Sequence, residues 1–188
     1  MKRILLVSPL SDNESLWVTG EESVEVKNNF PPLGLATIAA MTPKERFNVQ
    51  LWDEIVHGVV DEDVLQRFNP DLVGVTGYKH HLPRCRAIAQ LARKNNVLTA
   101  IGGPGVSGSP YDYRADFDVL FINEAEYTWG QFLNDWDAES VQEEYRQIEK
   151  PELDVTPVPC WDSISGDMNK YAMGVVQTTR GCPFDCEF

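Results

Sequence analysis

The sequence of 188 residues has few basic residues, few cysteines and no long hydrophobic run. Its 16 Lys and Arg stand against 29 Asp and Glu, giving a net charge of −13. This charge argues against nucleic-acid and anionic-membrane partners, because phosphate binding depends on clustered Lys and Arg. Four cysteines are too few and too unevenly spaced for a secreted disulfide scaffold. No apolar run approaches the roughly 20 residues that span a bilayer. We therefore expect a soluble, cytoplasmic, globular protein without a transmembrane segment.

Short apolar runs alternate with helix-like segments along most of the chain, and this alternation is typical of an α/β fold with a parallel sheet. The start, MKRILLVSPL, is interpreted as a strand, since no small-residue cleavage site of a signal peptide follows it. Right-handed crossovers leave few topologies for such a chain. We predict a flavodoxin-like (Rossmann-like) five-stranded parallel sheet in the order 2-1-3-4-5, with helices on both faces. The expected strands are 4–7, 47–53, 72–76, 97–101 and 117–122, and the main expected helices are 33–41, 61–68, 82–92 and 127–136.

The character of the sequence changes after Asp137. Residues 138–170 mix Glu, Pro, Asp and Ser, and their prolines are expected to prevent regular structure, so we interpret them as a linker. Residues 171–179 resemble a strand again and lead directly into Arg180-Gly181-Cys182. The predicted organisation is thus a domain over 1–137, a linker over 138–170, and the beginning of a second unit over 171–188.

Two cysteines near the end of the sequence, Cys182 and Cys186, follow the predicted strand and a glycine. Two thiolates at this spacing can fold around one metal centre but cannot complete it, because a cubane cluster needs at least three protein sulfurs and structural zinc needs four ligands. Cys85 lies on an apolar helical face, where a buried structural thiol is the more common role, and Cys160 stands alone in the linker.

A glycine-rich segment, Gly103 to Gly108, fits the G-x-G-x-x-G pattern after a strand, with Glu124 about 20 residues further on. Taken literally, this is a dinucleotide-binding fingerprint. However, it follows the fourth predicted strand instead of the first, and Ser109-Pro110 come where the helix should continue. Dinucleotide binding is therefore kept only as an alternative.

Several loop residues follow directly on the predicted strands, and in an open parallel sheet ligands lie beyond the carboxyl ends of the strands. Glycine lacks Cβ and so permits a ligand to approach the backbone closely, which suits Gly102 and Gly103. We expect the ligand site at this edge. The segments that fall there are Pro9-Leu10, Asp53-Glu54, Thr76 to Tyr78, Gly102 to Pro104 and Asn123 to Glu126.

The segment Gln177 to Phe188 resembles the start of the cluster loop of radical SAM enzymes, C-x3-C-x2-C with an aromatic residue before the third cysteine, which here would follow Phe188. Residues 1–137 resemble the cobalamin-binding domain of flavodoxin-like fold that many of these enzymes carry at their N-terminus. The run Thr156 to Asp162 is similar to the joining segment in the subfamily that contains hopanoid methylases. The resemblance implies the cobalamin-binding region of a B12-dependent radical SAM enzyme, truncated within its cysteine motif.

The resemblance rests on three short motifs of the domain. Thr76-Gly77-Tyr78 matches the family's Ser-x-Leu, with the hydroxyl kept and a bulkier ring in place of leucine, and Gly102-Gly103 matches its Gly-Gly. Asn123 to Glu126 matches G-E-x-E, with Asn at a position where a positive φ is tolerated. Together with the sheet-edge argument, this assigns two sets of ligands. Cofactor binding is assigned to Pro9, Leu10, Thr76, Gly77, Tyr78, Gly102, Gly103, Pro104, Asn123 and Glu124, and [4Fe–4S] ligation to Cys182 and Cys186.

One family motif is absent, the D-x-H-x-x-G that supplies a histidine to cobalt in some cobalamin proteins. The resemblance therefore implies cobalamin bound with its tail displaced and without a ligand from that motif. His80 and His81 lie just past the third predicted strand. The axial ligand stays open between His80, His81 and none.

For the whole enzyme, the resemblance implies a [4Fe–4S] cluster that binds S-adenosylmethionine, a deoxyadenosyl radical that removes hydrogen from the substrate, and methylcobalamin as the methyl donor. The expected parent is a methyltransferase that acts on an unactivated carbon of a small molecule, such as a lipid or tetrapyrrole, and uses an electron donor. The 188 residues alone are expected to bind cobalamin without catalysis.

Two alternatives remain. One is a B12-dependent radical SAM cyclase of the bacteriochlorophyll type. The other is a non-enzymatic flavodoxin-like nucleotide-binding or signalling receiver module, although Thr76 replaces the aspartate that a receiver phosphorylates.

Overall fold

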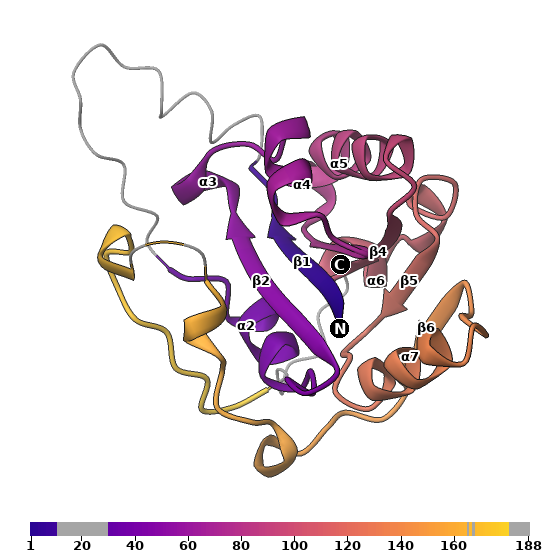
Figure 1. The fold of residues 1–188 in the computed structure, drawn as a ribbon. Helices are drawn as coiled ribbons and strands as arrows, with labels where there is room; N and C mark the ends of the chain where they lie inside the picture. Colours follow the sequence, from indigo (N-terminus) through magenta and orange to yellow (C-terminus); the bar gives the residue numbers. More distant parts are fainter. Residues whose placement is uncertain (11–29, 165, 167, 181–188) are drawn as a thin grey trace.

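The computed structural model describes residues 1–10, 30–164, 166 and 168–180. Its centre is a six-stranded, all-parallel sheet in the order β2-β1-β3-β4-β5-β6 (Figure 1). The predicted α/β class, the parallel sheet and the order 2-1-3-4-5 are confirmed, and one more strand extends the sheet beyond β5. The strands are β1 Lys2–Ser8, β2 Phe47–Asp53, β3 Leu72–Thr76, β4 Leu98–Gly102, β5 Val119–Ile122 and β6 Glu144–Arg146.

Helices cover both faces of this sheet, as predicted, with α2 and α7 on one face and α4 and α5 on the other (Figure 1). The four apolar residues 4–7 of β1 are at most 2% exposed and alternate between the two apolar cores. Ile4 and Leu6 pack with α2 and α7, and Leu5 and Val7 with α4 and α5. The helices are α2 Leu33–Ala40, α3 Glu54–His57, α4 Glu62–Phe68, α5 Leu82–Lys94, α6 Pro104–Gly108 and α7 Thr128–Asp137.

Strand β6 corrects the prediction that residues 138–170 lack regular structure and that the sheet has five strands. It pairs in parallel with β5 from Glu144 to Arg146. Its central residue, Tyr145, is 2% exposed, and its ring stacks on Phe121 with the centroids 5.5 Å apart. The Tyr145 hydroxyl donates a hydrogen bond of 2.7 Å to Asp135 of α7. The backbone pairing with β5 and the buried Tyr145 side chain thus hold this short edge strand, and the prolines that argued against structure come after it.

Beyond β6, the chain runs to the opposite edge of the sheet. The Cys160 amide donates to the Ala36 carbonyl of α2 at 2.9 Å, and Ile164 bridges to Leu51 of β2. The Tyr171 hydroxyl donates to Oδ2 of Asp53 at 3.0 Å, and Asp53 is fully buried. The predicted strand over 171–179 is wrong for the described residues. A strand needs a partner for its backbone groups, and no described segment pairs with residues 172–180.

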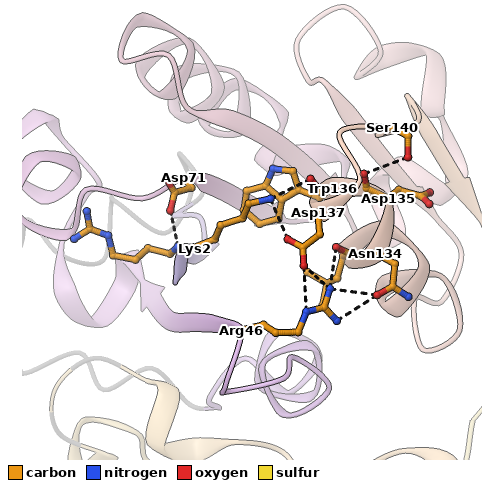
Figure 2. A network of polar contacts seen from close by, with 10 residues as sticks. Lys2, Arg46, Asp71, Asn134, Asp135, Trp136, Asp137 and Ser140 are labelled. Carbon is orange, nitrogen blue, oxygen red and sulfur yellow. Dashed lines mark hydrogen bonds and ion pairs between the residues drawn. The ribbon is translucent and has the colours of Figure 1, made fainter.

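A cluster of charged side chains joins the C-terminal end of α7 to the amino ends of β1 and β2 (Figure 2). Lys2 lies over the Trp136 ring, 4.4 Å from its centroid, and forms an ion pair with Asp137 at 3.1 Å. Arg46 pairs with the same carboxylate at 2.6 Å and reaches Asn134 at 3.2 Å. The hydrogen bond from Arg46 holds the pKa of Asp137 below its ordinary value. This cluster lies at the amino ends of β1 and β2, so the opposite, carboxyl edge is left for a ligand.

Candidate ligand pocket at the carboxyl edge of the sheet

A pocket of about 830 Å³ opens at the carboxyl edge of the sheet, on the face that α2 and α7 cover. Its walls come from the ends of β3, β4 and β5, from α2 and from the loop between β5 and α7. The segment after β6 and the distant residues Gln177 and Arg180 complete it. Its volume falls within the roughly 300–1,000 Å³ of small-molecule sites.

Small residues make the floor of this pocket. Gly74 of β3 is paired in register with Leu6 of β1 and with Ala100 of β4, and Thr76 is paired with Gly102. Residues two apart on a strand share a face, so these positions form two rows on the side of α2 and α7. A Cβ on Gly74 would lie only 2.9 Å from the Leu6 side chain. We call this part of the pocket, which is lined by Leu6, Gly74, Thr76, Ala100 and Gly102, the slot; Leu6 fills the space beside Gly74.

The loops that follow β3 and β4 interlock at the mouth of the slot. Gly103 has a φ of +102°, and a Cβ there would lie 2.7 Å from the Thr76 hydroxyl oxygen and 3.1 Å from the Gly77 backbone. The Gly105 amide donates to the Gly77 carbonyl at 3.0 Å. The sequence-predicted residues Thr76, Gly102, Gly103 and Pro104 therefore come together, with Tyr78 in the pocket lining and Gly77 directly behind it.

The third glycine of G-x-G-x-x-G does not have the role that a dinucleotide fingerprint requires. In that fingerprint it permits close packing of a helix on the sheet. Here Gly108 ends the five-residue helix α6, and nothing lies within 4 Å of the position that its Cβ would take. The geometry thus argues against a dinucleotide site at this loop.

Asn123 adopts the positive φ, +69°, that its place in the glycine-led motif predicts. Its amide donates to the Ser107 hydroxyl at 2.8 Å, and its side-chain Nδ2 donates to the Gln147 carbonyl at 2.8 Å. The loop after β5 is thereby joined to both α6 and the segment after β6. Glu124 follows it into the pocket lining.

Arg180 is a pocket residue that sequence reasoning did not select. Its guanidinium forms an ion pair with Glu126 and lies 3.7 Å from Oε2 of Glu124, and its side chain is only 13% exposed. Gly74, Ala100 and Gln147 also line the pocket without having been selected. The sequence offers only a partial signal, namely small residues inside strands of otherwise large side chains. Which residues face the pocket depends on the register of the strands and on how the distant segment folds over the sheet.

Pro9 and Leu10 lie past the end of β1 but do not line the pocket. The Leu10 amide donates at 3.0 Å to Glu54, whose side chain is fully buried. Glu54 also accepts from Arg84 Nε at 2.8 Å and from the Val60 amide at 2.6 Å. This carboxylate is therefore occupied in joining the segments of Leu10 and Val60 to α5, and it does not line the pocket.

Neither His80 nor His81 lines the pocket. The two rings lie side by side, with centroids 4.1 Å apart, and His80 stacks on Tyr78. Nδ1 of His81 accepts a hydrogen bond of 3.0 Å from the Tyr78 amide. In a neutral ring the proton then resides on Nε2, so that nitrogen has no lone pair for a metal. The choice of axial ligand stays a prediction.

The predicted cluster ligands Cys182 and Cys186 lie outside the described residues. Within the described ranges, no group of three or more His, Cys, Asp or Glu could hold a metal ion. Cys85 is buried as predicted, and burial raises the pKa of its thiol to about 12, so the thiol stays protonated at neutral pH. No helix among the described residues is long and apolar enough to cross a bilayer.

Comparison with known protein families gives a match between residues 23–133 and the B12 binding domain. The chain is 29% identical to an uncharacterized methyltransferase of Pyrococcus horikoshii, in a match that covers 99% of the chain and 44% of that protein. It is 31% identical to the hopanoid C-2 methylase of Rhodopseudomonas palustris, with 84% of the chain and 29% of that protein covered. It is 26% identical to the bacteriochlorophyllide d C-8(2)-methyltransferase of Chlorobaculum tepidum, with 83% and 35% covered. The chain thus spans less than half the length of these relatives.

Proposed function

Because this chain belongs to the B12 binding domain family, we propose that its pocket at the carboxyl edge of the sheet binds cobalamin. The observation that carries the proposal is the slot floored by Gly74, Ala100 and Gly102, with the Thr76 hydroxyl at its mouth. Apart from Leu6, the slot residues lie within the part of the chain that the family match covers.

The shape and chemistry of the slot suit the flat base at the end of the cofactor's nucleotide tail. The strand rise of about 3.3 Å per residue gives the two rows of small residues a length of about 7 Å along the strands. Leu35 and Ile38 of α2 and Phe121 of β5 line its sides. Apolar walls of this kind bury an aromatic base favourably, and the Thr76 hydroxyl can hydrogen-bond a polar atom of the tail.

The domain's own contribution is to bind, orient and shield the cofactor. Bound cobalamin supplies a cobalt centre that can carry a methyl group, whereas the protein supplies position and a dry pocket. The interlocked loops of Gly77 and Gly103 and the Asn123 anchor hold the mouth of the slot in one arrangement before the ligand arrives. Such preorganisation reduces the free-energy cost of binding.

For the parent protein, we propose a B12-dependent radical SAM methyltransferase. Three relatives carry methyltransferase or methylase names, and each extends well beyond this chain. The C-x3-C spacing of Cys182 and Cys186 supports a [4Fe–4S] cluster that binds S-adenosylmethionine. In this proposal residues 1–137 are the cobalamin domain, 138–170 the connection and 171–188 the start of the catalytic unit. The substrate class is a small molecule, such as a lipid or tetrapyrrole, and an electron donor is required.

Filling the slot tests the binding proposal. Ala100→Leu places a larger side chain on the slot floor, so we expect the hydroxocobalamin Kd to rise at least about tenfold, by exclusion of the tail. The matched control is Gly130→Ala on α7, where nothing lies within 4 Å of the new Cβ and the pocket is not reached. Titrations followed by the visible spectrum give both Kd values, and thermal unfolding verifies that both variants fold. Equal Kd values for the two variants, or binding of NAD without binding of cobalamin, would contradict the proposal.

A further inference from the structure

Residues 172–180 reach the pocket as a segment that is attached at its two ends. The segment forms no helix or strand, and most of its residues are exposed. Just before it, Tyr171 is buried and its hydroxyl donates to Asp53 at 3.0 Å. Among residues 172–180, Arg180 alone forms a hydrogen bond or ion pair with another described segment. Arg180 is therefore the attachment on the pocket side.

This attachment is an ion pair between Arg180 and Glu126 of the loop after β5. The two side chains are 13% and 8% exposed, so the pair is largely removed from water. Each partner is also oriented within its own segment, because Arg180 Nε donates to Gln177 at 3.2 Å and the Ala125 amide donates to Glu126 at 3.1 Å. Loss of the Arg180 charge would leave the Glu126 carboxylate mostly buried without a cation, which is much less favourable than the pair.

The same ion pair belongs to the pocket wall. Arg180, Glu126 and Gln177 all line the pocket that contains the slot. With the nucleotide tail of cobalamin in the slot, the much wider corrin ring is left to the rest of the pocket and its rim. A ligand that contacts this wall binds best when residues 172–180 are docked, that is, packed against the pocket as in the structure. By linkage, such a ligand stabilises the docked segment, and docking strengthens ligand binding by the same factor.

The docking of this segment is open to control by a ligand. Ordering an exposed stretch of chain costs conformational entropy at every residue, and few contacts repay it here. Segments with few buried contacts open with a small free energy, so a modest gain in contacts shifts their equilibrium.

We propose that the Arg180–Glu126 ion pair couples the docking of residues 172–180 to cobalamin binding. The inference rests on the proposed function and makes Arg180 a positioning residue, which acts through Glu126 by holding the pocket wall in place. In this proposal, bound cobalamin orders the segment that leads to Cys182, the first proposed cluster ligand, and the ordered segment in turn retains the cofactor.

Hydrogen exchange measures this coupling on the unaltered chain. The exchange of backbone amides in residues 172–180 is followed by mass spectrometry with and without saturating hydroxocobalamin. We expect the cofactor to slow this exchange at least about fivefold. The buried residues 4–7 of β1 should exchange slowly in both cases.

Substitutions at the pair identify the residues responsible. Arg180→Gln should raise the hydroxocobalamin Kd at least about fivefold and abolish the slowing of exchange in residues 172–180. Arg180→Lys keeps the charge opposite Glu126 and should stay within about threefold of the wild type. Glu126→Gln should raise the Kd as well, and the double variant should bind no more weakly than Arg180→Gln alone, because both residues act through one contact.

Arg146→Gln is the matched control, since it removes an exposed ion pair with Glu144 outside the pocket and should change neither quantity. Slow exchange of residues 4–7 verifies that each variant is folded. Unchanged exchange of residues 172–180 on cobalamin binding, or wild-type affinity in Arg180→Gln or in Glu126→Gln, would overturn the coupling while cobalamin binding stands. Failure of hydroxocobalamin to bind the wild type would overturn the proposed function and the coupling with it.

Discussion

Gly103 lines the pocket and also sets how closely two of the loops around it can pack. In the sequence, the glycine at this position is explained by the close approach of a ligand to the backbone. The structure adds a second reason for a glycine. With φ at +102°, a side chain would collide with the Thr76 hydroxyl and with the Gly77 backbone. Gly103 therefore sets the distance between the loops after β3 and β4, and Gly102 keeps its side of the slot open.

We predict that Gly103→Ala destabilises the protein and weakens cobalamin binding together. A non-glycine residue at such a φ costs about 1–3 kcal/mol, and 1 kcal/mol corresponds to about 2–4 °C of Tm in a chain of this size. The expected fall in Tm, measured by circular dichroism, is thus several degrees. Gly108→Ala is the matched control, because its Cβ would meet nothing within 4 Å. A Tm for Gly103→Ala equal to that of the control would show that the loops do not interlock as described.

Single residues also show where sequence reasoning succeeds for the site. Thr76, Gly102 and Asn123 were predictable because each directly follows or ends a strand, and the ends of parallel strands meet at one edge. Arg180 and Gln147 were not, since their positions depend on how a long segment folds back over the sheet. Gly74 and Ala100 become visible only when the register of β3 and β4 is known.

At the scale of elements, burial decides what the sequence can predict. The residues 4–7 of β1 are covered on both faces, and an uninterrupted apolar run predicts such a strand directly. Strand β6 has the sequence Glu144-Tyr145-Arg146 with only one buried side chain, so no periodic pattern could reveal it. The pairing of so short a strand depends on tertiary packing, and the prolines that follow it in the sequence indicate the opposite.

The attachment of α7 to the amino ends of β1 and β2 gives a pH prediction. Because Arg46 lowers the Asp137 pKa below its ordinary value of 3.8, the ionised carboxylate stabilises the folded state above that pH. The stabilisation is lost as the pH falls through the lower, folded-state pKa. Asp137→Asn should therefore be less stable than the wild type by the same amount at pH 5 and pH 7, with the difference shrinking below about pH 4. Urea unfolding at each pH measures this.

The exposed Asp154, which has no hydrogen bond or ion pair to a described residue, supplies the control for that series. Asp154→Asn should follow the wild-type stability at every pH. A gap between Asp137→Asn and the wild type that stays constant down to pH 3 would mean that the Asp137 carboxylate is not the titrating group.

At the scale of the whole molecule, residues on both sides of the proposed boundary at 170 pack against the domain. Tyr145, Ile164 and Tyr171 are buried in the same apolar cluster as α2 and α7. The segment crosses from the β6 edge to the β2 edge and delivers Gln177 and Arg180 to the pocket. The proposed boundaries at 137 and 170 thus mark a change in sequence character, whereas the packing continues across them. The pocket is consequently built by both ends of the described chain.

The central claim is that the slot takes the tail of cobalamin, and one comparison tests it most directly. The wild-type chain is incubated separately with hydroxocobalamin and with diaquocobinamide, which has the same corrin ring but no nucleotide tail. Each mixture is then gel-filtered and its visible spectrum recorded. We predict that corrin absorbance co-elutes with the protein for hydroxocobalamin, and that cobinamide elutes separately. A protein fraction free of corrin absorbance in both cases, or equal retention of the two corrinoids, would contradict the account.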